Sequence, residues 1–392
     1  MSSIEDSVSE SSYENKEKNE EENEEKSEEE NESEDSKTES EVTEKMSNDE
    51  IKPMVIPDKP LTQELAACCL SLLHRLGYGF SHAFIKFNCV NKKITDISIL
   101  ESFRFLRFVN LSHNYISDLT PLFAAEYLMY LKVDHNYITL PGTHKNLQYL
   151  QFMDLSYNKL RSTDYINHGR LKHLILNNNE IGTLCGIDAP PLNQFKLRAL
   201  ETLELHGNKI TSTDGLENLF DLKTLYCSGN LLRSVGDLSK MQGLVTLYLM
   251  DNRIENLDGF IKGLPKLKYL NLGGNLIDRW TEVKKLSFIL PLRTLILSGN
   301  PITDRENYRP ITLGMMNKLQ RLDKEKTTPE EISDSQQFFQ TLDERYIDED
   351  VEEDNRDDKE IAEDVNVDDD KESAKMKKRK STIRVENNDF RE

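Results

Sequence analysis

One spacing pattern, LxxLxLxxNxL, recurs along most of this chain and restricts its fold more than any other feature. Its first copy contains Leu106, Val109, Leu111, Asn114 and Ile116. The asparagine position recurs in register nine times, as Asn114, Asn136, Asn158, Asn179, Asn208, Asn230, Asn252, Asn275 and Asn300. The spacings between them are 22, 22, 21, 29, 22, 22, 23 and 25 residues, and each is followed two residues later by Ile or Leu. A fixed period of this length indicates a stack of similar units.

The residue types predict leucine-rich repeats. Alternating apolar residues in the short LxL segment favour a strand whose inward side chains form a core. The asparagine amide both donates and accepts, so it satisfies backbone groups in the sharp turn that follows. Apolar residues at a threefold spacing then predict short 3₁₀ or helical segments. We therefore predict an α/β solenoid: an SDS22-like leucine-rich-repeat horseshoe with a parallel concave sheet.

The boundaries of the repeats also follow from the pattern. We place one degenerate copy and nine regular ones at 81–304. The degenerate copy contains Phe84, Phe87, Cys89 and Ile94, with Lys92 in the asparagine position. The 29-residue spacing before Asn208 indicates a loop inserted around 189–196, ahead of the fifth strand.

A solenoid exposes apolar surface at both ends, so each end needs a cap. We predict an N-terminal cap helix within 58–80, running from Leu61 to Leu76 with Thr62 as N-cap and Gly77 after its last turn. At the other end, 305–329 is similar to the cap motif that closes such solenoids, in which a helix covers the last coil.

The two ends of the chain are strongly acidic. Residues 1–50 carry 21 acidic and 5 basic side chains, and residues 330–372 carry 20 and 4. Such segments bury too little apolar surface to offset the entropy of ordering, so we predict disorder over 1–57 and 330–392. A basic cluster interrupts the second tail at 375–380, and the body at 51–329 has a net charge of +8.

Several classes of function are disfavoured by composition. No apolar run approaches the roughly 20 residues of a membrane span, and Glu5 and Asp6 stand where a signal peptide needs basic and apolar residues. The five cysteines show no metal-binding spacing, which favours reduced intracellular thiols. His113 and His135, each just before a ladder asparagine, are interpreted as solvated turn residues. We expect no catalytic residues, no metal, no cofactor and no small-molecule substrate.

The strand positions that face away from the core define a candidate binding surface for protein partners. Two aromatic clusters stand out among them, comprising Phe108, Tyr130, Phe152 and His173, and Tyr226, Tyr248 and Tyr269. Exposed aromatic residues are enriched in binding hot spots. Equally, neighbouring rings in one row could simply stack and stiffen the sheet, and the sequence does not decide between these interpretations.

Three segments carry a more specific resemblance. The stretches LTQELAACCLSLLHRLGYGFSHAFIKF (61–87), ITDISILESFRFLRFVNLSHNYISDLTPL (94–122) and YRPITLGMMNKLQRLDKE (308–325) resemble the leucine-rich repeat-containing protein 23 family. The resemblance spans about 60–330. It implies a structural scaffold in the radial spokes of ciliary and flagellar axonemes, with other spoke subunits as partners. The expected location is the cytoplasm and cytoskeleton of the cilium or sperm flagellum.

Two other functions compete with this one. Acidic leucine-rich nuclear proteins and phosphatase-binding SDS22-like proteins also combine such repeats with adaptor roles, and 377–380 could act as a nuclear signal. Nucleic-acid binding is a weaker alternative, because the acidic tails would compete for the basic body.

Overall fold

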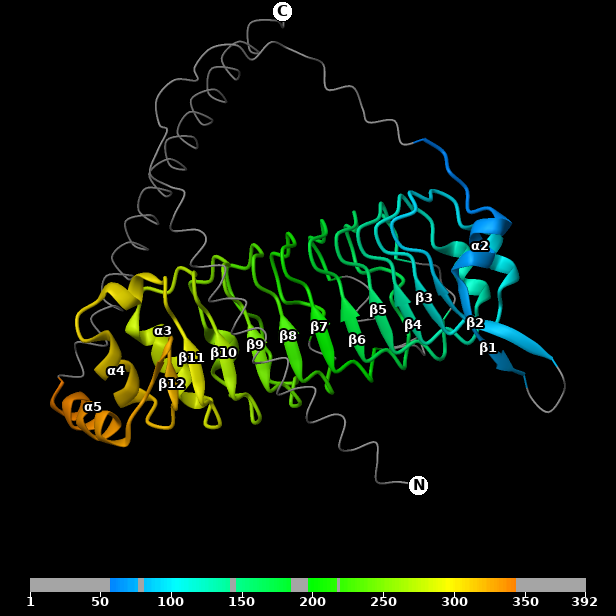
Figure 1. The fold of residues 1–392 in the computed structure, drawn as a ribbon. Helices are drawn as coiled ribbons and strands as arrows, with labels where there is room; N and C mark the ends of the chain where they lie inside the picture. The colour runs from blue at the N-terminus through cyan, green and yellow to red at the C-terminus, as the bar shows by residue number, and fades with distance from the viewer. Residues whose placement is uncertain (1–56, 77–80, 142–145, 185–196, 217–218, 343–392) are drawn as a thin grey trace, which may run out of the picture. The chain divides into compact units, whose positions relative to one another are not determined.

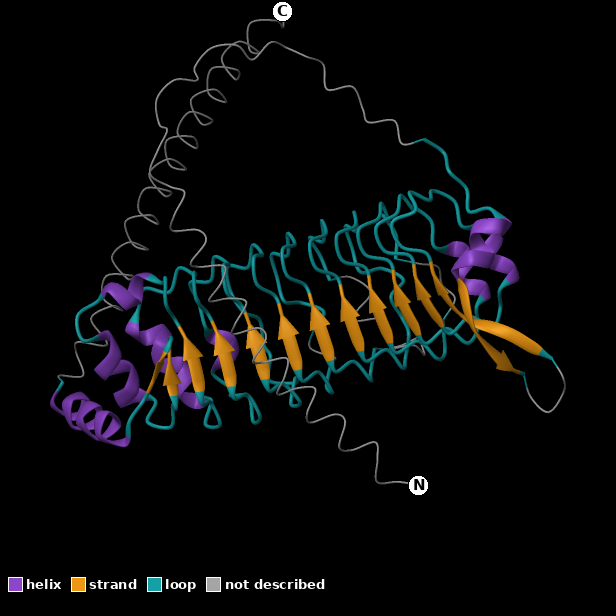
Figure 2. Cartoon of the chain, in the orientation of Figure 1, coloured by secondary structure: helices purple, strands orange, loops and turns teal. Residues whose placement is uncertain are grey.

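The computed structural model describes residues 57–76, 81–141, 146–184, 197–216 and 219–342. Within them, the strands form one 13-stranded sheet in chain order, from β1 to β13. Figure 1 shows these strands side by side as successive steps of a solenoid, and Figure 2 shows loops, and in some coils short helices, on the return path. No helix among the described residues is both long enough and apolar enough to cross a bilayer.

Nine three-residue strands form the regular part of the sheet, and each pairs in parallel with the next. They are β3 (Phe108–Asn110), β4 (Tyr130–Lys132), β5 (Phe152–Asp154), β6 (His173–Ile175), β7 (Thr202–Glu204), β8 (Thr224–Tyr226), β9 (Thr246–Tyr248), β10 (Tyr269–Asn271) and β11 (Thr294–Ile296). The central residue of every strand is buried. This arrangement confirms the predicted leucine-rich-repeat solenoid with its parallel sheet.

Short helical segments occupy the return path of several coils. They are η1 (Ser98–Ser102), η2 (Thr120–Ala124), η3 (Asp258–Phe260), α3 (Trp280–Lys285) and η4 (Leu286–Phe288). Leu122, Phe260 and Trp280 of these segments are almost completely buried. The core is therefore a continuous column between the strands and these segments, because one coil alone cannot bury its apolar edge.

The ladder asparagines link each coil to the one before it. In Asn252, Nδ2 donates to the Cys227 carbonyl of the preceding coil at 3.0 Å and to the Leu249 and Met250 carbonyls of its own turn. Its Oδ1 accepts from the Leu232 amide of the preceding coil at 3.1 Å. The other eight asparagines make the same kind of bonds, and all nine are buried. Each amide thus satisfies backbone groups that the turn leaves away from water.

The N-terminal end differs from the predicted helix. Thr62 is the N-cap and accepts from the Leu65 amide, but α2 (Gln63–Cys69) ends well before Leu76. The chain continues as β1 (Leu70–Arg75), which pairs antiparallel with β2 (His82–Asn88). The helical prediction for 70–76 is therefore wrong, since pairing with a later strand outweighs the local spacing of leucines. Leu72, placed on the buried helix face by that spacing, is 56% exposed.

The structure of the degenerate repeat agrees with the prediction for three of its four apolar residues. β2 joins β3 in parallel, and Phe87, Cys89 and Ile94 are fully buried. Phe84, however, is 43% exposed because it lies in the hairpin opposite Leu73. At Lys92 the backbone amide is satisfied by Oδ1 of Asn114 in the next coil.

The C-terminal end has two helices. After η5 (Pro301–Asp304), α4 (Tyr308–Met315) precedes β12 (Arg321–Leu322) and β13 (Glu325–Lys326), and α5 (Pro329–Thr341) follows. Figure 1 shows α4 and α5 together at the β12 end of the sheet. The predicted disorder is wrong for 330–341: Thr328 and Glu331 form a capping box, and Phe338 and Phe339 pack against the core. Residues 1–56 and 343–392 of the tails, which include the basic cluster, and the inserted loop lie outside the described residues.

Candidate partner-binding surface

The strand pairing places the solvent-facing side chains in two ordered rows, which we call the strand face. The first row runs through Phe108, Tyr130, Phe152, His173, Thr202, Thr224, Thr246, Tyr269 and Thr294, each opposite the next across the sheet. The second row runs through Asn110, Lys132, Asp154, Ile175, Glu204, Tyr226, Tyr248, Asn271 and Ile296. Parallel pairing without offset brings side chains of one row close together.

The first aromatic cluster is a stacked column. The Tyr130 and Phe152 rings lie 4.4 Å apart between centroids and are inclined by only 5°. His173 continues the column, tilted, with its ring centroid 6.4 Å from that of Phe152. Phe108 precedes Tyr130 in the same row and is 36% exposed. The other three residues are half-buried, so each ring contacts a neighbour and keeps part of its surface in water.

The second cluster crosses between the two rows. Tyr226 and Tyr248 stack at 4.7 Å between centroids, and Tyr248 lies 4.8 Å from Tyr269. All three tyrosines are half-buried. Threonines separate the two clusters in the first row, at Thr202, Thr224 and Thr246.

Charged residues flank the first cluster. Nζ of Lys132 contacts Oδ2 of Asp154 at 3.0 Å and Oδ1 of Asp134 at 3.6 Å. Burial lowers the pKa of Lys132, but the hydrogen bond that its ammonium donates to Asp154 and the charge of both aspartates outweigh burial and raise the pKa above its usual range. Burial raises the pKa of the neighbouring Tyr130. The cluster therefore presents a neutral phenol beside a fully charged ammonium.

Two positions of the second row are not accessible to a partner. Asp154 is buried, and its Oδ1 accepts from the Ser156 amide at 3.0 Å. Asn271 is buried too, and its Oδ1 accepts from the Gly273 amide at 3.0 Å. Both side chains stabilise the turn after their own strand. The sequence pattern placed them on the outward row, but tertiary packing makes them structural.

A further column of aromatic rings lies at the turn that follows the strands. His113 stacks on His135 at 4.1 Å between centroids, and His135 stacks on Tyr157 at 4.2 Å. These residues line one groove together with Tyr115, Tyr137 and Lys159. Treated separately, each histidine is consistent with a solvated turn, so sequence reasoning missed the column. The sequence does contain a signal for this column: in three consecutive coils, a residue with a large ring occupies the position just before the ladder asparagine.

Comparison with known proteins places the chain in a family. The leucine-rich repeat family model matches residues 192–351. The bovine leucine-rich repeat-containing protein 23 (Bos taurus) is 36% identical over 302 residues, which cover 72% of this chain and 80% of the relative. The human protein of the same name (Homo sapiens) is 37% identical over 304 residues, with 72% and 80% covered. This chain belongs to the leucine-rich repeat-containing protein 23 family.

The leucine-rich repeat-containing protein 23 relatives match 72% of this chain. Among solved structures, the functional domain of InlJ from Listeria monocytogenes is similar, with a TM-score of 0.47 and 26% identity, covering 60% of this chain and 47% of that chain. An internalin (inlF) from the same organism gives a TM-score of 0.42 with 20% identity, covering 67% of this chain and 85% of that chain. Proteins of this repeat class serve as protein-interaction scaffolds.

Proposed function

We propose that this protein is a non-catalytic scaffold subunit of the axonemal radial spoke, supporting motility of cilia and sperm flagella. The partners are other spoke proteins, and they bind on the strand face. The proposal needs no small-molecule substrate, cofactor, nucleic acid or membrane. Its starting point is membership in the leucine-rich repeat-containing protein 23 family, whose curated relatives match 72% of this chain.

The observation that best supports a binding role is the stacked but half-exposed column at Tyr130 and Phe152. Stacking and binding are compatible here, because each ring contacts its neighbour and still offers surface to a partner. Rings already held in place lose little conformational entropy on association, so more of the buried apolar area contributes to affinity. The paired Lys132 ammonium beside them supplies a charged rim.

A matched pair of double variants tests the strand face. Tyr130→Ala with Phe152→Ala removes the column on the strands. The control is Tyr127→Ala with Tyr149→Ala, which removes another stacked aromatic pair, 5.8 Å apart and 43% and 40% exposed, from outside the strands. We expect the first variant to lose co-purification with spoke proteins from demembranated axonemes, while the control keeps it. Equal recovery by both folded variants would exclude the strand face.

Localisation tests the cellular part of the proposal separately. A tagged full-length chain expressed in ciliated cells is expected along the axoneme, at the positions of the radial spokes. A protein distributed through nucleus and cytoplasm would instead support an adaptor of the nuclear or phosphatase-binding type, and would contradict the spoke assignment whatever the strand-face variants show.

A further inference from the structure

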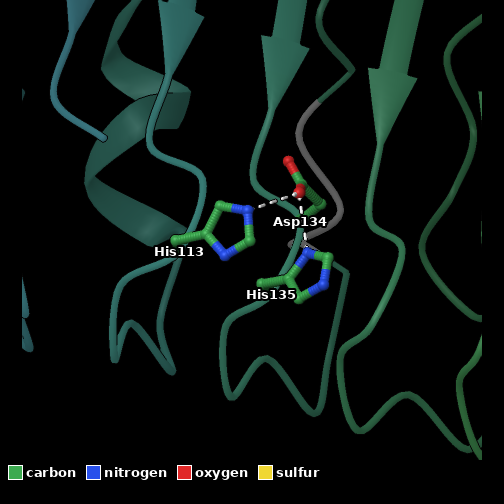
Figure 3. Close-up of side chains that lie close together, drawn as sticks. All are labelled: His113, Asp134 and His135. Carbon is green, nitrogen blue, oxygen red and sulfur yellow. Dashed lines mark hydrogen bonds and ion pairs between the residues drawn. The ribbon is translucent and has the colours of Figure 1, made fainter. Parts of the chain in front are cut away.

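A second site lies at the turn after β4, beside the strand face. Asp134 and His135 come from this turn, and His113 comes from the corresponding turn of the preceding coil. Nδ1 of His135 lies 2.8 Å from Oδ2 of Asp134, and Nε2 of His113 lies 3.8 Å from the same oxygen. Figure 3 shows both imidazole rings turned toward this one carboxylate.

Hydrogen bonding to Asp134 explains the position of only one of the two histidines. His135 is within hydrogen-bond distance of Asp134, but His113 at 3.8 Å is beyond it. The three ligand atoms lie within 4.8 Å of one another. Two ligands of a tetrahedral Zn²⁺ ion, each about 2.0–2.1 Å from the metal, are separated by about 3.4 Å. Small rotations of the two rings therefore bring all three atoms to coordination distance.

The carboxylate is already oriented for such a role. Its other oxygen, Oδ1, accepts a hydrogen bond from the Ser112 hydroxyl and lies 3.6 Å from the Lys132 ammonium. These contacts direct Oδ2 toward the imidazoles, as outer-shell partners do for metal-binding carboxylates. Asp134 is buried, and it is the only aspartate among the residues two positions before the ladder asparagines.

The backbone of the turn accommodates both histidines. Both have left-handed φ values, 57° for His113 and 53° for His135. The equivalent left-handed position in the six later coils after Tyr157 is filled by Asn178, Gly207, Gly229, Asp251, Gly274 and Gly299. Glycine adopts this conformation without strain, and asparagine, aspartate and histidine adopt it more readily than other residues. The same position therefore accommodates imidazoles in two consecutive coils and the Tyr157 ring in the third.

We propose that His113, Asp134 and His135 bind a Zn²⁺ ion through two imidazole nitrogens and one carboxylate oxygen. Two nitrogens and one carboxylate form a ligand set that Zn²⁺ favours. The fourth position faces solvent, because the His113 and His135 side chains are 52% and 40% exposed. It accepts water, or a side chain of a protein docked in the groove. The ion links two adjacent coils.

The test is a zinc titration of the full chain followed by calorimetry, with excess Mg²⁺ and Ca²⁺ present to occupy carboxylate-only sites in the acidic tails. The variants are His113→Asn, His135→Asn and Asp134→Ser. Each introduces a residue that the same position holds in another coil, as in Asn178 and Ser156, so the fold is retained. The matched control is Tyr157→Asn, which removes a stacked ring and no ligand.

We expect one Zn²⁺ per wild-type chain and per Tyr157→Asn chain. Each ligand variant should bind at least about tenfold more weakly, since loss of an outer-shell partner alone costs about 10–100-fold. Visible absorption of the Co²⁺-loaded chain gives a second readout, with tetrahedral bands that disappear in His113→Asn. Equal zinc affinity in wild type and all three ligand variants would overturn the proposal. So would a loss in Tyr157→Asn matching that in His135→Asn, because ring stacking would then be responsible.

Discussion

Replacing a single ladder asparagine tests the physical account of the fold most directly, and Asn252→Ala is the appropriate change. The amide is buried in the middle of the solenoid. Its NH2 group serves three carbonyls, of Cys227, Leu249 and Met250, at 3.0–3.2 Å, and its oxygen accepts from the Leu232 amide at 3.1 Å. Alanine leaves all four backbone groups without this partner in a turn that excludes water.

The magnitude follows from the number of hydrogens available. Two amide hydrogens and one accepted bond amount to three hydrogen bonds, each contributing about 1–1.5 kcal/mol net. The free energy of unfolding should therefore fall by roughly 3–4.5 kcal/mol. Because the bonds to Cys227 and Leu232 join adjacent coils, the loss includes coupling between neighbours as well as the stability of one turn.

The assay is urea denaturation of the full chain followed by circular dichroism, with a lower midpoint expected for Asn252→Ala. Asn317→Ala, at an exposed asparagine outside the ladder, should leave the midpoint unchanged. Asn252→Asp is a stricter test: its oxygen still accepts from Leu232, but a carboxylate would face three carbonyl oxygens. If Asn252→Asp is as stable as wild type, donation by the ladder amides does not hold the coils together.

Three further predictions concern other parts of the solenoid. Gly259→Ala places a Cβ 2.2 Å from the Gly236 carbonyl oxygen, so the backbone must shift and thermal melting should show a free energy of unfolding lower by about 1–3 kcal/mol. The control is Gly182→Ala, whose Cβ would lie 3.9 Å from the Lys209 carbonyl oxygen and should leave the stability unchanged. Burial lowers the pKa of His168 to about 4, whereas the pKa in the unfolded chain is 6.5. The stability that depends on the neutral ring is therefore complete above about pH 6.5 and is lost as pH falls toward about 4. Urea titrations should show about 2 kcal/mol lost between about pH 7.5 and 5, and no such loss in His168→Gln. The hydrogen bond from Arg309 lowers the pKa of Glu331, so the stability that this ion pair gives to α5 is complete above the ordinary glutamate pKa and declines as pH falls through the lowered value. Amide exchange in α5 should show this decline, by less than about 1 kcal/mol, and Glu331→Gln should abolish it.

The repeating part of the fold could be predicted from the sequence because every coil has the same local pattern of core and turn residues. Inward leucines at fixed spacing and one asparagine per turn define the strand, its neighbours and its register, and the predicted rows match the pairs in the sheet. The position of Tyr130 beside Phe152 follows from that register alone. The exposed fraction of each ring does not follow from the register, because it depends on the stacking geometry.

The ends and the turn residues were decided by tertiary structure. Leu72 has a helical spacing, yet its segment pairs with β2 because an open sheet edge gains hydrogen bonds from a partner strand. The start of α5 has an acidic, tail-like composition, yet its capping box and the packing of Phe338 and Phe339 order it. His113 and Asp134 meet only because two turns 22 residues apart in the repeat lie side by side. Periodicity describes contacts that every coil shares, whereas each of these contacts occurs once and depends on the particular side chains that tertiary packing brings together.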